Sequence, residues 1–235
     1  MNLNTSWILG GCFIIGLSTA SVLLGQQMQQ LKAMERIVQV KGLAERDVNA
    51  DTVIWPVKFI EVGQNLTDVI SQVEKKNEQI AAFLKLHGFN SEEISFSVPQ
   101  VQDRQAGYNE GRSEQARYTA TSVVTIYSQQ VDKALHAMQK LIELSKNGIA
   151  IAGQDYDAKP EFIFSDLNQL KPLMIEEATK NARDVATRFA ADSGSKVGKI
   201  KQANQGQFSI SDRDSSTPHI KKVRVVSTVD FYLSD

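Results

Sequence analysis

The hydrophobic residues of this chain follow three patterns, and the first is an uninterrupted apolar run near the N-terminus. The nineteen residues from Trp7 to Gly25 contain no charged side chain, and the first one in the chain is Lys32. As an α-helix rising about 1.5 Å per residue, this run spans roughly 28 Å, close to the ~30 Å hydrocarbon core of a bilayer. It therefore predicts an N-terminal transmembrane helix, anchored by Trp7, Ile8, Leu9, Phe13, Ile14, Ile15, Leu17, Val22, Leu23 and Leu24.

Two other interpretations of this run stay open. Ser18 to Ala20 resembles the small-residue site at which signal peptides are cleaved, and cleavage near Ala20 would release the domain. Against cleavage, Val22 to Leu24 continue the apolar run and no Lys or Arg precedes it, so an uncleaved anchor is the preferred interpretation. A core helix of a soluble domain would show a polar stripe, which three scattered hydroxyl residues do not make.

The second pattern is hydrophobic residues that recur every three or four positions, which predicts amphipathic helices. A first helix is predicted over 66–84, with Asn65 or Thr67 as its cap and Gly88 as its end. A second is predicted over 128–145 by the same spacing.

The third predicted helix is the longest and follows Asp166 and Gln169, which are spaced as a capping box. Pro172 indicates that its regular part begins only at the proline, because an interior proline removes a helical hydrogen bond. Gly194 ends the pattern.

The third pattern is the alternation of hydrophobic and polar residues, which predicts strands with one buried face. A first strand leads from Ile37 to Gly42, near which we expect the first turn. A second runs from Thr52 to Val62, and its Pro56 requires an edge or a bulge because proline cannot donate to a ladder. Further strands are predicted over 94–98, 118–127, 149–157, 161–164, 197–210 and 223–233.

This order of elements predicts an α+β fold of antiparallel sheets with three amphipathic helices. Residues 1–35 form the anchor and a glutamine-rich polar stalk, and residues 36–235 form the domain. A strand–strand–helix unit occurs twice in this prediction, which opens a division of the domain into subdomains of about 36–148 and 149–235. The polar stretch from Gln102 to Arg117 is expected to be a hairpin loop.

The composition of the chain restricts its possible functions more than its possible folds. The 235 residues are 42% hydrophobic and 23% charged with a net charge of −1, and their basic residues are scattered along the sequence, so we expect no nucleic-acid partner. The only cysteine, Cys12, lies inside the apolar run, which leaves the domain without thiol chemistry. Lys32 and Arg36 follow the anchor and favour a cytoplasmic domain, yet long domains cross membranes regardless of charge.

The three histidines are the scarcest candidates for chemistry. His87 precedes Gly88 and is expected to bond the last carbonyls of the first helix. His136 is expected on the solvent side of the second helix, and His219 lies in a loop. No pair of them has metal-ligand spacing, and the segment from Asp212 to Ser216 lacks the glycine and glutamate of a calcium loop, so we expect neither metal nor cofactor.

Several short segments carry a family resemblance. They are Val40 to Glu45 with Ala50–Asp51, Leu86 to Phe89, Tyr118 to Thr121, Phe164 to Asp166, Ala182 to Ala186 and Ala190 to Gly198. Together they resemble the SIMPL-domain family, a domain of unknown function that includes periplasmic immunogenic proteins of bacteria. The chain departs from the family pattern at Leu43–Ala44, where a second glycine is usual, and at Ala50, where proline is common, which leaves the position of the first turn open.

The resemblance implies an exported bacterial protein of α+β fold, whose relatives are tied to envelope or oxidative stress and assemble into ring-like or channel-like homo-oligomers. It implies no enzyme activity. Combined with the apolar run, it predicts a single-pass protein of the bacterial inner membrane that meets the lipid bilayer through residues 7–25 and carries its domain in the periplasm. The expected function is that of a self-assembling structural or interaction protein of the cell envelope.

Two alternative functions remain at this point. The first is a binding module for a peptide, a lipid or a periplasmic client, which would use the polar stretch 102–117 or the strand that contains Pro56. The second and more remote is a hydrolase, which would require the fold to bring His219 and Asp212 together with a Ser or Tyr hydroxyl.

Overall fold

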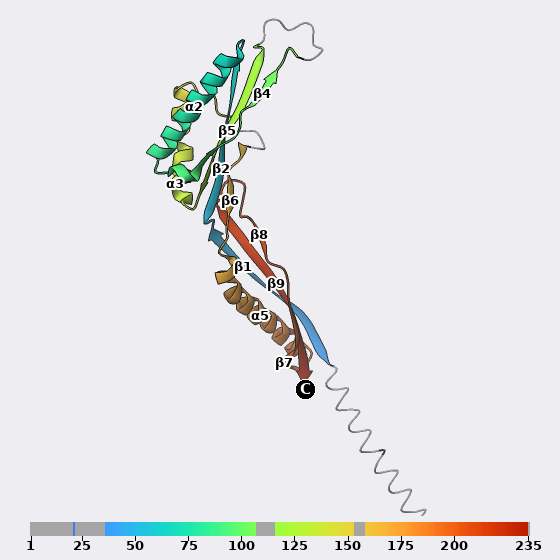
Figure 1. Ribbon diagram of the computed structural model, residues 1–235. Helices are drawn as coiled ribbons and strands as arrows, with labels where there is room; N and C mark the ends of the chain where they lie inside the picture. Colours follow the sequence, from blue (N-terminus) through green and yellow to red (C-terminus); the bar gives the residue numbers. More distant parts are fainter. Residues whose placement is uncertain (1–20, 22–35, 107–115, 153–157, 235) are drawn as a thin grey trace, which may run out of the picture. The chain divides into compact units, whose positions relative to one another are not determined.

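The computed structural model describes residues 21, 36–106, 116–152 and 158–234 (Figure 1). The chain forms two units, and each is discontinuous in sequence. Unit 1 comprises Met1–Arg46, Asn168–Ser209 and Val223–Asp235, and unit 2 comprises Asp47–Leu167 and Ile210–Lys222. This division differs from the expected one near residue 148, because the first strand of the domain pairs with its last.

Unit 1 is built on a four-stranded sheet in the order β1 (Ile37–Asn49), β9 (Ile220–Ser234) and β7 (Lys196–Gln205), with β8 (Ser209–Asp212) also paired to β9. The backbone N–H of Leu233 donates to the carbonyl of Arg36 at 2.9 Å. Side chains bridge the same two strands further along, from Gln39 to Asp230 at 2.9 Å and from Arg224 to Glu45 at 3.6 Å. The predicted pairing of the first two strands in one repeated unit is therefore wrong.

Helix α5 (Leu167–Asp192) lies along one face of this sheet (Figure 1). The helix starts directly after Asp166, and Pro172 is inside it, so the expectation that regular helix begins only at the proline is wrong. Its buried residues recur at every fourth position and are almost all alanine: Met174, Ala178, Ala182, Ala186 and Ala190. Small side chains at these positions let the sheet approach the helix closely.

Gly42 lies at the closest point of that approach. A Cβ atom at this position would lie 1.8 Å from the carbonyl oxygen of Ala178 and 2.5 Å from the nitrogen of Ala182. The strand continues through Gly42 to Asn49, so the turn expected here is absent. The glycine serves close contact between backbones and not a change of chain direction.

Unit 2 contains a five-stranded antiparallel sheet in the order β3 (Ile94–Phe96), β5 (Tyr118–Ser128), β2 (Thr52–Gly63) and β6 (Glu161–Ile163), with β4 (Gln100–Asp103) also paired to β5. Strands β2 and β5 form its centre, paired from Val53 opposite Ser128 to Gly63 opposite Tyr118. The close agreement of β2 with its predicted range reflects the strong alternation of its residues.

Pro56 lies in this central strand and not on an edge of the sheet, contrary to the simplest form of the prediction. The carbonyl of Lys58 accepts a hydrogen bond from Ala152 on the side away from β5, and residues two apart in a strand point the same way. The nitrogen of Pro56 therefore points away from β5. The pairing of β2 with β6 stops at Ile54, so within the described part of the chain no strand pairs with β2 at the proline.

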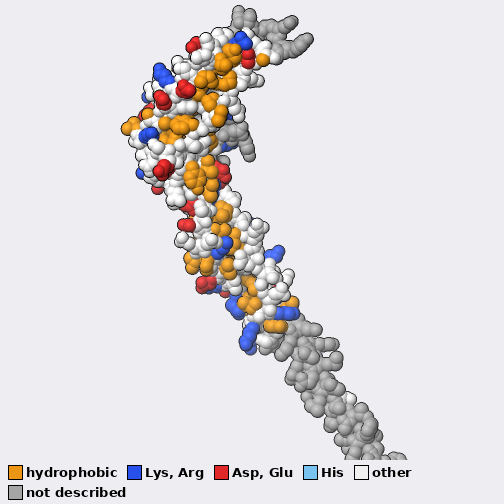
Figure 2. Space-filling view, viewed as in Figure 1, with side chains coloured by type: hydrophobic (Ala, Val, Ile, Leu, Met, Phe, Trp, Pro, Cys, Tyr) orange, Lys and Arg blue, Asp and Glu red, His pale blue; other side chains and the backbone are white. Residues whose placement is uncertain are grey.

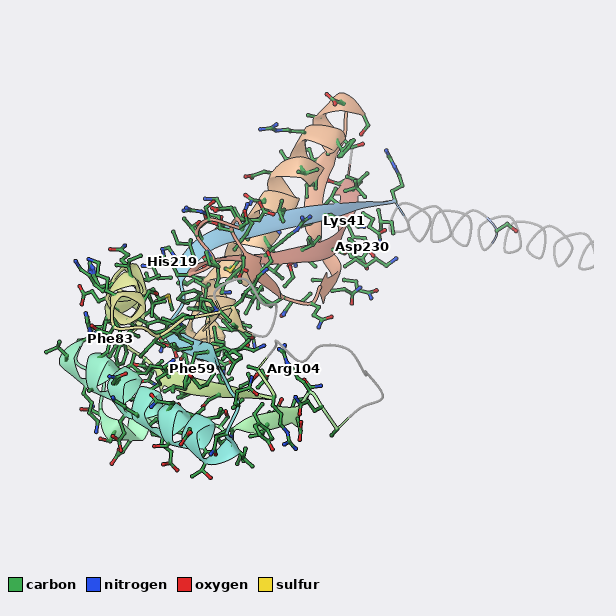
Figure 3. All side chains as sticks on the ribbon, turned by 90° about the horizontal axis from the view of Figure 1, so that it is seen from above. Lys41, Phe59, Phe83, Arg104, His219 and Asp230 are labelled. Carbon is green, nitrogen blue, oxygen red and sulfur yellow. The ribbon has the colours of Figure 1, made fainter. Side chains whose placement is uncertain are left out.

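Helices α2 (Leu66–Leu86) and α3 (Val131–Gln139) cover one face of the β2–β5 pair (Figure 1). The core between them contains Phe59 of β2 and Phe83 of α2, both labelled in Figure 3. The second predicted helix is divided, because α3 ends at Gln139 and the short α4 (Ile142–Lys146) follows. A 3-10 turn, η1 (Ser91–Glu93), leads into β3, and with α5 the three predicted amphipathic helices are present.

The predicted membrane anchor, residues 7–25, lies outside the described residues apart from Ser21. Of the helices that the structure describes, none combines the length and the apolar composition needed to cross a bilayer. The central part of the predicted loop, residues 107–115, and most of the strand expected over 149–157 also lie outside the described residues. Ile151 forms a single bridge to Phe59 just before that gap.

Candidate functional site

The sheet of unit 2 has a second face, opposite the one that α2 and α3 cover. We call it the open face. It is formed by Ile54, Pro56, Lys58, Ile60 and Val62 of β2 with their partners Tyr127, Thr125, Val123, Thr121 and Thr119 of β5. These residues alternate with the buried Val53, Trp55, Val57 and Phe59, so period-two alternation places them on this face.

The open face exposes large side chains at both of its ends. Ile60 and Val62 are 42% and 52% exposed, and Tyr127 at the other end of the face is 59% exposed. On the side away from β5, β6 pairs only over Thr52–Ile54 and the bridge to Ile151 ends at Phe59. Within the described part of the chain, residues 60–63 thus present an unpaired strand edge, which is a template for a further strand.

A pocket of about 470 Å³ lies elsewhere in unit 2. It is bounded by Asn49 and Ala50, by residues 129–133 at the start of α3, and by His219. The backbone N–H of Ala50 donates to the carbonyl of His219 at 2.8 Å, which closes one side. Amides, an aspartate, a lysine and an imidazole give the pocket polar walls, and no Ser, Thr, Tyr or Cys is among its lining residues.

The hydrolase hypothesis required His219 and Asp212 to meet, and they do not. Asp212 forms an ion pair with Lys221, whereas the ring of His219 packs edge-on against Phe162 with ring centres 6.0 Å apart. No hydrogen bond joins the two side chains among the described residues. Nor do three or more His, Cys, Asp or Glu side chains of the described residues gather as a metal site.

The start of α3 beside the pocket is held by a carboxylate. Glu93 accepts hydrogen bonds from the hydroxyl of Ser128 and, at 3.2 Å, from the amide of Gln130. Burial raises the pKa of Glu93, but these bonds and the one from the backbone of Asn90 outweigh it and hold the pKa below its usual value. The network connects the 3-10 turn η1 to the residue that precedes α3.

Asp51 is the second carboxylate that organises unit 2. It accepts hydrogen bonds from the backbone N–H of Ser165 at 2.6 Å, from the Ser165 hydroxyl at 2.7 Å and from the Thr52 hydroxyl at 2.8 Å. A fourth comes from the backbone of Asp166 at 3.2 Å. Burial raises its pKa, yet the bonds from Ser165 and Thr52 more than compensate, and the pKa lies below its usual value.

His87 and His136 take the positions that the sequence predicted. The Nδ1 atom of His87 lies 2.8 Å from the carbonyl oxygen of Phe83, and the two rings are in contact with centres 4.2 Å apart and planes tilted by 43°. Gly88 follows with φ at +90°, as a helix end requires. His136 is exposed on α3, and both histidine predictions are confirmed.

The segment from Asp212 to Ser216 is a turn, as predicted. The carboxylate of Asp214 accepts hydrogen bonds from the Thr217 hydroxyl and, at 2.8 Å each, from the backbone N–H groups of Ser216 and Thr217. Bonds from Thr217 and Arg213 hold the pKa of Asp214 far below its usual value. Through these local contacts, the carboxylate of Asp214 stabilises the turn.

Comparison of the sequence with models of protein families identifies a family that matches most of the chain. A model of the SIMPL family, described as a protein of unknown function (DUF541), matches residues 38–231. The chain belongs to the SIMPL family. Among curated proteins, no sequence matches it.

The SIMPL resemblance rests on residues that make structural contacts in both units. Asp51 and Ser165, from two separate motif segments, meet in the hydrogen bonds of unit 2. Gly42 and Ala182, from two others, meet where β1 packs on α5 in unit 1. The matched motifs therefore contribute contacts that stabilise both units of the SIMPL fold.

Sequence reasoning missed two features of this SIMPL domain. The pocket combines residues from three distant segments, and nothing in their local pattern indicates that they meet. The unpaired edge at Ile60 and Val62 was also missed, although Pro56 was a signal that this side of β2 lacks a full partner. The predicted hairpin loop is closed at its base by an ion pair between Asp103 and Arg117 at 2.9 Å.

Proposed function

We propose that this SIMPL protein is anchored in the bacterial inner membrane through residues 7–25, carries its domain in the periplasm, and assembles with copies of itself as a structural or interaction protein of the cell envelope. The proposal gives it no catalytic role. Its main support is the unpaired, apolar edge of β2 at residues 60–63. A soluble monomer normally blunts such an edge with charge or covers it.

The side chains at this edge suit a second copy of the chain. Ile60 and Val62 carry no charge, and the neighbouring Glu61 is neutralised by its ion pair with Lys76. Two β2 edges can therefore approach without like-charge repulsion and pair antiparallel across a two-fold axis. Anchoring in one bilayer would raise the effective concentration of each copy for its neighbours.

The mass of the detergent-extracted full-length protein tests this proposal. We expect a species of at least twice the chain mass at micromolar concentration, measured by light scattering with the detergent contribution subtracted. A monomer at that concentration would contradict self-assembly. Protease digestion of spheroplasts tests the location, because a periplasmic domain is cut and a cytoplasmic one is protected.

The same edge also fits the alternative function, in which an extended client peptide adds a strand to β2. One experiment separates the two occupants. A photo-crosslinking amino acid at Gln64, the exposed residue next to this edge, gives adducts of twice the chain mass if a second copy docks there. Adducts of other masses would favour a client, and the absence of adducts would contradict both.

A further inference from the structure

The two units carry different charge. The described residues of unit 1 contain eleven Lys or Arg and six Asp or Glu, a net charge of +5. Those of unit 2 contain thirteen Lys or Arg and fifteen Asp or Glu, a net charge of −2. The near-neutral total of the chain conceals this difference, and unit 1 is the one that the N-terminal apolar run enters.

Five of the eleven cations of unit 1 lie toward the end of its sheet where β1 begins. We call this the basic end and define it by Arg36, Arg183, Lys196, Lys199 and Lys201. Figure 2 shows Lys and Arg atoms clustered at this end of the described chain. The residues come from β1, α5 and β7, which is why the sequence alone shows scattered charges and no patch.

Side-chain contacts join these three elements at the basic end. The Arg36 guanidinium donates to the Ser195 hydroxyl at 3.0 Å, next to Lys196. The Arg183 guanidinium donates to the carbonyl of Gly198 at 3.4 Å and lies 4.7 Å from the centre of the Phe231 ring. The ammonium of Lys201 lies 5.9 Å from the centre of the Tyr232 ring.

The three lysines of β7 are exposed. Among the described residues, no carboxylate lies within ion-pair distance of Lys196, Lys199 or Lys201. Asp230, which lies opposite Gln202 on the neighbouring strand, is bonded to the amide of Gln39. This end of unit 1 therefore offers a positive surface to an external anion.

We propose that the basic end binds the anionic phospholipid headgroups of the bilayer in which the chain is anchored. Only residues 26–35 separate the apolar run from Arg36, and ten residues reach about 15 Å as a helix or at most ~35 Å extended. The inference thus rests on the proposed anchor, which would hold the basic end close to the headgroups. Anionic membrane surfaces attract such clusters with roughly fivefold tighter binding per basic residue.

Lysines on an edge strand also prevent unwanted strand pairing, and β7 is an edge strand. That role does not depend on lipid composition, so a change of lipid composition distinguishes headgroup binding from the prevention of strand pairing. The test places the full chain in nanodiscs of phosphatidylcholine alone and in nanodiscs with about one third phosphatidylglycerol. Lysine acetylation rates are then measured by mass spectrometry in both.

We expect Lys196, Lys199 and Lys201 to react at least about threefold more slowly in the anionic discs, and high salt to remove the difference. Lys75 and Lys85, exposed on α2, are internal controls that should react equally in both discs. Equal acetylation rates for the β7 lysines in the two discs would contradict the proposal that the basic end binds anionic headgroups. This comparison uses the unaltered chain, so it does not depend on any variant folding.

A charge-reversal variant sharpens the assignment. Lys199→Glu with Lys201→Glu should abolish the protection of Lys196 in anionic discs, whereas Lys75→Glu with Lys85→Glu should preserve it. Retention of the chain reports separately on the anchor. If the chain stays bound to both kinds of nanodisc and the β7 lysines react equally in them, the basic end is overturned and the anchor is not. If the chain stays bound to the anionic nanodiscs alone, the basic end is supported and the anchor is overturned. If the chain stays bound to neither, both are overturned.

Discussion

The carboxylate of Asp51 accepts hydrogen bonds from both the backbone N–H and the hydroxyl of Ser165, which follows it by 114 residues. These bonds join the start of β2 to the segment just before α5. Both residues belong to motif segments of the SIMPL family. Because hydrogen bonds to a charged carboxylate are stronger than those between neutral groups, Asp51 stabilises this contact more than its partial exposure suggests.

Replacing this carboxylate tests its contribution to stability. Asp51→Asn keeps the shape of the side chain but removes its charge and turns one acceptor oxygen into a donor nitrogen. We expect the free energy of unfolding to fall by about 1–3 kcal/mol in urea denaturation. Asp47→Asn at a nearby exposed position is the control, and an equal effect of the two substitutions would contradict the assignment.

The lowered pKa of Asp51 also predicts how its contribution depends on pH. A carboxyl whose pKa is lower in the folded state stabilises the fold above its unfolded value, near 3.8, and this stabilisation disappears as the pH falls through the folded value. The stability difference between the wild type and Asp51→Asn should therefore be full at pH 6 and shrink below about pH 4. A difference that stays constant down to pH 3 would be inconsistent with this origin.

Gly42 has no room for a side chain. In Gly42→Ala the new Cβ atom would meet backbone atoms of Ala178 and Ala182, which cannot move without shifting α5. We expect a loss of roughly 2–4 kcal/mol in unfolding free energy. Leu43→Ala, at an exposed neighbouring position, should cost less than about 1 kcal/mol, and similar losses for the two variants would argue against close strand–helix contact.

Two histidines form a matched pair, His87 at the end of α2 and His136 on α3. His87→Ala removes both the bond to the Phe83 carbonyl and the ring contact with Phe83, so we expect thermal and urea unfolding to show a loss of about 1 kcal/mol. His136→Ala, on the exposed face of α3, should stay within about 0.5 kcal/mol of the wild type. The prediction fails if the order of the two is reversed.

A charge on the β2 edge should prevent assembly without unfolding the domain. Val62→Glu places a like charge in both copies of a paired edge, and we expect the detergent-extracted protein to become monomeric in light scattering. Leu86→Glu, at a hydrophobic residue that is 83% exposed at the end of α2, is the control and should leave the mass unchanged. A Val62→Glu protein that still assembles would place the contact elsewhere.

The sequence predicted those parts of the fold that depend on local pattern. Alternation over Thr52–Gly63 and helical spacing over Leu66–Leu86 define β2 and α2 almost to the residue, because each has one buried face. The cap of α2 was left between two residues, and the structure assigns it to Asn65, whose side chain accepts from the N–H of Thr67 at 2.9 Å.

The parts that were not predicted depend on contacts between distant residues. Gly42 suits either a turn or a close approach, and only the presence of Ala178 and Ala182 against it decides between them. In the same way, alternation in β1 does not reveal that its partner is β9. The unpaired β2 edge and the basic end could not be predicted from the sequence for the same reason, because each depends on which strands are neighbours.

The hydrogen bond from Leu233 to Arg36 also has a consequence for biosynthesis. The strand that leaves the ribosome first among the elements of the domain is completed by the one that leaves last. Until the final fifteen residues of β9 have been translated, β1 has no partner and the sheet of unit 1 cannot close. A chain truncated just before Ile220 would keep its apolar N-terminal run while its adjoining unit remained unfinished, a species for quality-control proteases to remove.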